Sequence, residues 1–301
     1  MNLRSKRLAL KRMLEQNGFL SVLYNLPRLA KGYQPIFLDY PVRPVPRYGY
    51  SLEPHPELSR LFSENEGAYV QTLRGFLALR EGLMRIPLHQ DGPASEPCWI
   101  NNWLEGLDTF ALYGFVSSRN AAVHLEIGSG YSTKVVRRAI RDHQLRTRLV
   151  SIDPKPRAEI DTLCDEVVRK PLEDCDVNAI VNELKPGDTF FFDGSHRSFM
   201  NSDVTVLFLE ILPRLKPGVL VHIHDIYLPM DYMPDRAHWF YSEQYLLAAS
   251  LLAGHVGYEV LLPNNYISNT PRIACALDTF WQEPRLAGVP RQGCSFWIQT
   301  R

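Results

Sequence analysis

The stretch EIGSGYST (residues 126–133) decides the fold that we expect for this chain. It overlaps the end of the apolar run AVHLEIG (122–128) and opens YSTKVVRRAIRDH, whose apolar residues recur at helical spacing. This order predicts a strand, a turn with two glycines and then a helix. Free backbone N–H groups at the start of such a helix favour an anion such as a carboxylate or phosphate, and Gly128 and Gly130 permit its close approach.

Further apolar runs predict the other strands. Four of them alternate with helical runs: RLVSID (148–153), EVVRK (166–170), DTFFFDG (188–194) and GVLVHIHDI (218–226). Helical runs are expected after Pro156, after Asp174 and in VTVLFLEILPRL, so that each connection crosses over as a helix. Five strands joined in this way predict an α/β fold with a doubly wound, mostly parallel sheet that is covered on both faces. YEVLLP (258–263) and SFWIQT (295–300) predict two last strands, preceded by the helical run SEQYLLAASLLAG.

The composition limits the class of protein. The 301 residues include 33 basic and 33 acidic side chains and are 45% apolar, which allows a large core and excludes the basic excess that drives nucleic-acid binding. Five scattered cysteines without a C-x-x-C pair indicate neither a disulfide framework nor a zinc knuckle. No apolar run reaches the roughly 18 residues of a membrane helix. The start of the sequence lacks the apolar stretch of a signal peptide, so we expect a cytoplasmic protein.

The chain is expected to divide at about residue 100. Residues 1–99 form an N-terminal helical extension: a basic amphipathic helix within 1–31, a proline-rich connector, and a helical cap at 57–90. The basic helix is predicted either to contact an anionic membrane surface or a phosphorylated partner, or to rest on the body as a solvated helix. Residues 100–301 form the domain that carries the site.

Ligands of doubly wound sheets bind beyond the carboxyl ends of the strands. Asp153 ends the second strand 23 residues past Gly130, close to the offset of an acid that binds ribose hydroxyls. An adenosine-containing cofactor fits both the turn and this acid. A dinucleotide fold would place a third glycine at Thr133, and its absence disfavours an NAD-dependent oxidoreductase.

Polar side chains also end the fourth and fifth strands, which are neighbours if these strands pair. Asp193 and Asp225 would then converge with His196 and His224, a set that suits a hard divalent cation with an imidazole as general base. Asp225 also fits a role in orienting the His224 ring. His222 lies deeper in an apolar run and is predicted to be a core histidine.

The motifs EIGSGYSTKVV, SIDP, FFDGSHR and LKPGVLVHIHDIYLP together resemble the class I S-adenosylmethionine-dependent methyltransferases. They are most similar to the bacterial branch with EIGSGYST, DGSH and HDI at these strand ends, methyltransferase family 24. The resemblance covers residues 100–301. It implies the strand order 3-2-1-4-5-7-6 with an antiparallel seventh strand, for which SFWIQT is expected, and S-adenosylmethionine as cofactor.

The resemblance also implies which residues hold the cofactor. Glu126 and the two glycines match the turn beneath the methionine part, Ser132 stands where relatives use a hydroxyl for its carboxylate, and Asp153 matches the ribose ligand. The adenine usually contacts the loop that contains Glu173. The full set expected at the cofactor is Glu126, Gly128, Ser129, Gly130, Ser132, Asp153, Glu173 and Asp193.

Compared with the metal-dependent catechol-type enzymes, Asp193 and Asp225 match two acidic ligands of Mg²⁺ or another divalent cation. The catechol type has an Asn ligand where this chain has Ile226, so His224 or His196 is expected to complete the set. His196 falls where those enzymes carry a lysine base. It is the preferred general base, with His224 as the alternate.

The resemblance therefore implies O-methylation of a hydroxyl on a sugar or a secondary metabolite, a small-molecule or glycan acceptor. The aromatic and polar segment 227–245, with Trp239, Tyr241, Glu243 and Tyr245, is predicted either to form an acceptor lid or to pack as part of the cap. Two alternatives are a metal-dependent hydroxylase on the same fold, with iron on the carboxylates and imidazoles, and a non-catalytic cofactor-binding module.

Overall fold

A computed structural model describes residues 39–156, 159–254 and 257–301 of the chain, together with a few positions between 23 and 36. Its centre is a seven-stranded sheet in the order β3-β2-β1-β4-β5-β7-β6. The strands are β1 (Val123–Ile127), β2 (Arg148–Ile152), β3 (Glu166–Val168), β4 (Thr189–Phe192), β5 (Leu220–Ile223), β6 (Tyr258–Pro263) and β7 (Phe296–Thr300). The first five pair in parallel, and β7 runs antiparallel to both of its neighbours. The expected fold class, strand order and seventh strand are confirmed.

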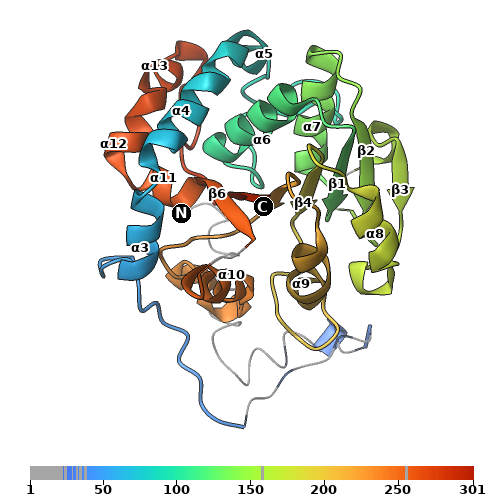
Figure 1. Ribbon diagram of the computed structural model, residues 1–301, viewed down its shortest axis with the longest axis vertical. Helices are drawn as coiled ribbons and strands as arrows, with labels where there is room; N and C mark the ends of the chain where they lie inside the picture. The colour runs from blue at the N-terminus through green and yellow to red at the C-terminus, as the bar shows by residue number, and fades with distance from the viewer. Residues whose placement is uncertain are drawn as a thin grey trace.

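Helices cover both faces of this sheet (Figure 1), with α4, α6 and α7 above it and α8, α9 and α10 below it in that view. The α-helices are α3 (Pro56–Ser63), α4 (Glu66–Phe76), α5 (Arg80–Met84), α6 (Gly106–Arg119), α7 (Tyr131–Asp142), α8 (Val177–Glu183), α9 (Asp203–Val206), α10 (Glu243–Leu252), α11 (Asn264–Ser268), α12 (Pro271–Ala274) and α13 (Asp278–Trp281). Because the strands are buried on both faces, β4 can consist of TFFF with every side chain buried.

Two crossovers differ from the sequence-based expectation. Between β2 and β3 a helix was expected after Pro156, but the described residues there form a single 3₁₀ turn at Asp161–Leu163. After α9 the chain continues as a π-helical turn, Leu207–Ile211, and a 3₁₀ turn, Leu212–Arg214. Pro213 lies in this last turn, and a proline cannot donate the backbone hydrogen bond that a longer α-helix needs.

The N-terminal helices α3, α4 and α5 share one hydrophobic core with the rest of the chain. Phe62 of α3, for example, lies with its ring centroid 5.6 Å from those of Tyr266 and Phe296. The boundary at residue 100 stays a prediction, and the basic helix within 1–31 falls almost wholly outside the described residues. None of the helices in the described ranges has the length and apolar character that spanning a membrane requires.

Candidate active site

A cavity of about 1490 Å³ opens at the carboxyl ends of β1, β2, β4 and β5. Its lining includes most of the residues that the sequence singled out: Gly128, Ser129, Gly130, Ser132, Asp153, Glu173, Asp193, His196, His224 and Asp225. Glu126 is the one member of the predicted set that is not part of the lining, because it is fully buried beneath the turn. The structure therefore gathers the predicted cofactor residues and the predicted catalytic residues around one space.

The turn after β1 needs a glycine at its first position. Gly128 has φ of +75°, a conformation that disfavours residues with a side chain, and a Cβ there would collide with the backbone carbonyl of Asp193. The Gly128 N–H donates to the Ile152 carbonyl at 3.1 Å. The turn thus packs tightly between the ends of β2 and β4.

Glu126 supports this turn from below. The Thr133 hydroxyl donates to Glu126 Oε2 at 2.7 Å, and the Gly130 N–H donates to the same hydroxyl at 3.0 Å. Burial raises the pKa of Glu126 to about 7. Its Oε1 is buried and makes no hydrogen bond within the described part of the chain. A buried carboxylate oxygen without a donor, beneath a glycine turn that lines the cavity, fits the cationic methionine end of S-adenosylmethionine.

Asp153 ties the end of β2 to the same turn. Its Oδ2 accepts the Ser129 N–H at 2.8 Å, and its Oδ1 accepts the Lys155 N–H at 2.7 Å. Asp153 Oδ2 also accepts the Ser129 hydroxyl at 3.2 Å, so Oδ1 is the oxygen with a lone pair left for a ribose hydroxyl. Pro171, Leu172 and Glu173 line the cavity nearby, where the resemblance places the adenine.

His196 follows the end of β4 and is surrounded by carboxylates. Its Nε2 lies 3.2 Å from Asp193 Oδ1 and 3.6 Å from Asp225 Oδ2, while its Nδ1 pairs with Glu243 Oε1. Burial lowers the pKa of His196, but the charges of Glu243 and Asp193 outweigh it, and the pKa is well above its ordinary value. The surrounding carboxylates therefore favour the protonated form of the ring.

Asp225 stays ionised between cationic neighbours. Burial raises its pKa, but His224 and His196 outweigh this effect and hold the pKa below its usual value. The Tyr227 hydroxyl donates to Asp225 Oδ1 at 3.1 Å, and Arg236 Nη1 lies 3.4 Å from the same oxygen. Arg236 thus adds a positive charge that spacing along the sequence did not indicate.

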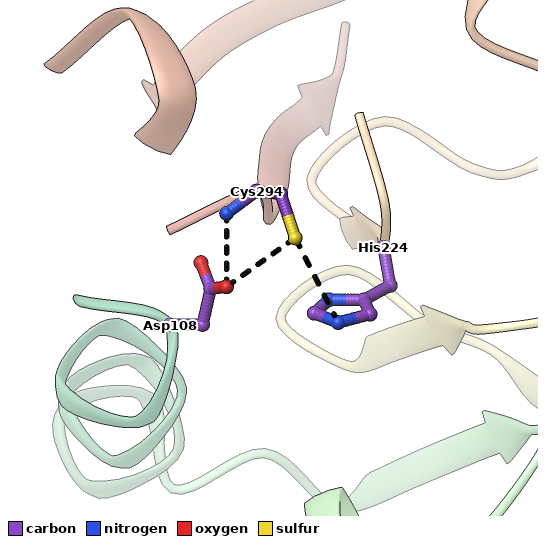
Figure 2. Close-up of side chains that lie close together, drawn as sticks. All are labelled: Asp108, His224 and Cys294. Atoms are coloured by element: carbon purple, nitrogen blue, oxygen red, sulfur yellow. Dashed lines mark hydrogen bonds between the residues drawn. The ribbon is translucent and has the colours of Figure 1, made fainter. Parts of the chain in front are cut away.

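His224 belongs to a different group of side chains, shown in Figure 2. Donor atoms of Asp108, His224 and Cys294 all lie within 4.8 Å of one another. Asp108 Oδ2 accepts the Cys294 N–H at 2.9 Å, and Asp108 Oδ1 accepts the Ser295 N–H at 2.9 Å and the Asn264 amide at 2.8 Å. Burial, with the charges of Asp108 and Asp225, raises the pKa of the Cys294 thiol.

Asp108 already accepts N–H donors from Cys294, Ser295 and Asn264, so these side chains form a buried hydrogen-bonded cluster. This cluster links α6, which carries Asp108, to Cys294 and Ser295 in the segment before β7. The His224 ring faces this cluster, since its Nε2 lies 4.0 Å from Cys294 Sγ and its Nδ1 lies 3.4 Å from Ser295 Oγ. Of the two candidate histidines, His196 is therefore the one whose ring nitrogen faces both Asp193 and Asp225.

His222 is a core residue, as predicted. Its ring stacks on Phe191 with centroids 3.9 Å apart, and its Nε2 shares a hydrogen bond with Ser295 Oγ at 2.8 Å. Burial holds the pKa of His222 well below its usual value, so the ring is neutral.

The segment 227–245 lines the cavity with some of its residues only. Arg236, Trp239 and Tyr241 line the cavity, whereas the Tyr245 hydroxyl donates to Asp231 Oδ1 at 3.0 Å and is not part of the lining. Glu243 is fully buried against His196, a contact between residues 47 positions apart that no local motif signals.

Comparisons with known proteins agree with this geometry. Residues 125–226 match a family model described as a methyltransferase domain, Methyltransf_24. No curated protein sequence matches the chain. Residues 125–226 are therefore a methyltransferase domain of this family, and with the class I strand order the chain is an S-adenosylmethionine-dependent methyltransferase.

Several solved structures resemble this chain at low sequence identity and with low TM-scores. The O-methyltransferase TomG of Streptomyces achromogenes is 16% identical, with 63% of this chain and 77% of that chain covered and a TM-score of 0.34. The methyltransferase PaMTH1 of Podospora anserina is 14% identical, with coverage of 84% and 100% and a TM-score of 0.40. A CmcI structure with Mg-SAM in its name is 14% identical, with coverage of 75% and 95% and a TM-score of 0.37.

Proposed function

We propose that this methyltransferase transfers the methyl group to a hydroxyl oxygen of a small-molecule or glycan acceptor. The observation that carries the proposal is the single cavity that joins the β1 and β2 turns to Asp193, His196 and Asp225. A cofactor held at the turns and a hydroxyl held at the three polar side chains would share that space. Arg236, Trp239 and Tyr241 supply a polar and aromatic wall that suits such an acceptor.

S-adenosylmethionine supplies a methyl group that its sulfonium charge makes electrophilic. The protein has to align the acceptor oxygen with that group and take the proton that the hydroxyl loses. Three carboxylates, those of Asp193, Asp225 and Glu243, lie around the His196 ring, so the site offers several proton acceptors. The proton is proposed to pass to this group on the Nε2 side of His196, where Asp193 and Asp225 also lie.

A divalent cation fits the same donors in their chemistry. Asp193 and Asp225 would supply oxygens, and His196 Nε2, once deprotonated, would supply the nitrogen. Of the two histidines expected to complete the set, His224 instead faces Cys294 and Ser295. A bound cation would lower the pKa of the acceptor hydroxyl. The metal is a separate part of the proposal, and it is tested separately.

The test uses S-adenosylmethionine with a labelled methyl group and a panel of monosaccharides and phenols. We expect label in a product ether, and Asp225→Asn should reduce its rate at least 100-fold while leaving cofactor affinity within about threefold. The control is Tyr245→Phe, whose hydroxyl bonds Asp231 away from the cavity lining. Label on nitrogen or carbon, or none at all, would contradict O-methylation, and the hydroxylase and non-catalytic alternatives predict none.

The same assay after chelation and re-addition of Mg²⁺ tests the metal. A rate that falls on chelation and returns with Mg²⁺ supports the cation. A rate that chelation leaves unchanged removes the cation from the proposal and leaves the methyl transfer in place.

A further inference from the structure

Three consecutive residues, Tyr241, Ser242 and Glu243, surround His196 from a segment about 45 positions further along the chain. The Tyr241 ring lies with its centroid 4.5 Å from that of His196. The Ser242 N–H donates to the His196 carbonyl at 2.8 Å, and Ser242 Oγ accepts the Ser198 N–H at 2.9 Å. Glu243 Oε1 pairs with His196 Nδ1. The first residue of α10 and the two residues before it thus contact one ring nitrogen, the backbone and the ring face of His196.

Glu243 is poorly explained as a stabilising residue alone. It is 0% exposed, and its Oε2 has no hydrogen-bond partner in the described ranges. Burying a carboxylate is costly unless it is paired, and a hydrophobic residue at this position of α10 would avoid that cost. Its contact with His196 is therefore the feature that calls for a functional reason.

The orientation of the His196 ring supplies a functional reason for the Glu243 contact. With Nδ1 paired to Glu243, the opposite nitrogen Nε2 faces Asp193 Oδ1 at 3.2 Å and Asp225 Oδ2 at 3.6 Å. A carboxylate on one imidazole nitrogen fixes the ring orientation and the proton position, and so defines what the other nitrogen presents. Without this contact the ring would lose the partner of its Nδ1, and with it one restraint on its orientation.

The backbone of His196 also has to be held in place. Its φ is +62°, in the left-handed region that residues with a side chain rarely adopt. Such a conformation persists where surrounding contacts stabilise it. Ser242 supplies two of them: its N–H donates to the His196 carbonyl, and its Oγ accepts the N–H of Ser198 in the same loop.

We propose that Glu243 is a positioning residue that fixes the His196 ring, and that Ser242 holds the loop that carries it. The inference rests on the proposed function in one respect, namely that His196 acts at the acceptor. It goes beyond that function in assigning the orientation of His196 to α10, a helix outside the methyltransferase motifs.

The test is a ¹H–¹⁵N spectrum of the full chain labelled with ¹⁵N-histidine. We expect one strongly downfield Nδ1 proton that is lost in both His196→Asn and Glu243→Ala, and that moves upfield in Glu243→Gln, whose side chain has the same shape without the charge. Glu66→Gln, a change at a surface ion pair with Arg272, should leave it unchanged. A downfield signal that survives in Glu243→Ala would overturn the proposal.

This readout needs neither an acceptor nor methyl transfer, so its failure is distinct from a failure of the proposed function. Once the labelled-methyl assay has identified an acceptor, kinetic measurements complete the test. Glu243→Gln should lower kcat about 10- to 100-fold and leave the KM for S-adenosylmethionine unchanged. Loss of thermal stability together with an unchanged kcat in the folded fraction would assign Glu243 a structural role only.

Discussion

The two ends of the cavity are built in different ways. At the cofactor end, hydrogen bonds join residues that are close in sequence: Glu126 and Thr133 are 7 positions apart, and Ser129 and Asp153 are 24 apart. At the acceptor end, His196 and Glu243 are 47 apart, and Asp108 and Cys294, beneath His224, are 186 apart. The cofactor end is thus a local motif, while the acceptor end depends on how distant elements pack.

This difference predicts that substitutions at the two ends of the cavity have different effects. A change at the cofactor end should weaken binding of S-adenosylmethionine. A change at the acceptor end should lower the rate and leave that binding intact. The substitutions below test this division, beginning with the largest expected effect.

Gly128→Ala should abolish cofactor binding. The added Cβ would meet the Asp193 carbonyl in a turn with φ of +75°, so the backbone of the turn has to move. Calorimetric titration with S-adenosylmethionine measures the effect, with a loss of at least 100-fold expected. Gly67→Ala is the matched control, because a Cβ at that position in α4 meets no atom within 4 Å. Normal binding by Gly128→Ala would show that the turn does not hold the cofactor.

His196→Asn should lower methyl transfer about 100- to 10,000-fold, the usual contribution of a positioned proton-transfer group. The Asn side chain is smaller and cannot reach Glu243, Asp193 and Asp225 together. Single-turnover kinetics with labelled cofactor measure the rate, and a titration measures cofactor affinity, which we expect to stay within threefold of the parent value. A rate that equals that of the parent chain would remove His196 from the chemistry.

Much of the fold and half of the site could be predicted from the sequence. The strands are short runs rich in apolar residues, so all seven were found in place. The turn motif and the spacing after it located Gly128 and Asp153. The helix expected in the crossover after β2 was wrong, since the described residues there form only a 3₁₀ turn at Asp161–Leu163. The sequence did not indicate that Glu243 contacts His196 or that Arg236 contacts Asp225. Only the packing of α10 and of the loop before it brings these residues together.

Asp153→Asn should weaken S-adenosylmethionine binding about 10- to 100-fold, because a hydrogen bond to a charged group contributes roughly 1.5 to 3 kcal/mol. The Asn oxygen can still accept the Ser129 N–H, so the turn should remain folded. Equilibrium titration gives the affinity, and saturating cofactor should restore most of the rate. A rate that stays low at saturation would place Asp153 in the chemistry and would break the division between the two ends.

Glu126→Gln should change how stability depends on pH. Burial raises the pKa of Glu126 from 4.5 to about 7, so the folded chain keeps a proton that the unfolded chain loses. The stabilisation is fully present below pH 4.5 and is lost as pH rises to about 7, where the loss reaches roughly 3 kcal/mol. Urea unfolding of both chains at pH 5.0 and about 7.5 measures this, and the variant should lose less stability than the parent.

Glu66→Gln provides a control of opposite sign. A hydrogen bond from Arg272 holds the pKa of Glu66 below its ordinary value, so its contribution is present at high pH and is lost as pH falls. The Glu66 variant should therefore differ from the parent more at pH 7.5 than at low pH. Parallel pH dependence of the parent and Glu126→Gln would contradict the burial of an ionisable Glu126.

The most direct test of the account is a paired titration of S-adenosylmethionine into Asp153→Asn and His196→Asn, alongside the parent chain. We predict that the parent binds one cofactor per chain, that Asp153→Asn binds at least tenfold more weakly, and that His196→Asn binds with unchanged affinity while its methyl transfer is lost. No binding by the parent chain, or equal weakening by both substitutions, would contradict a cavity with a cofactor end and a separate acceptor end.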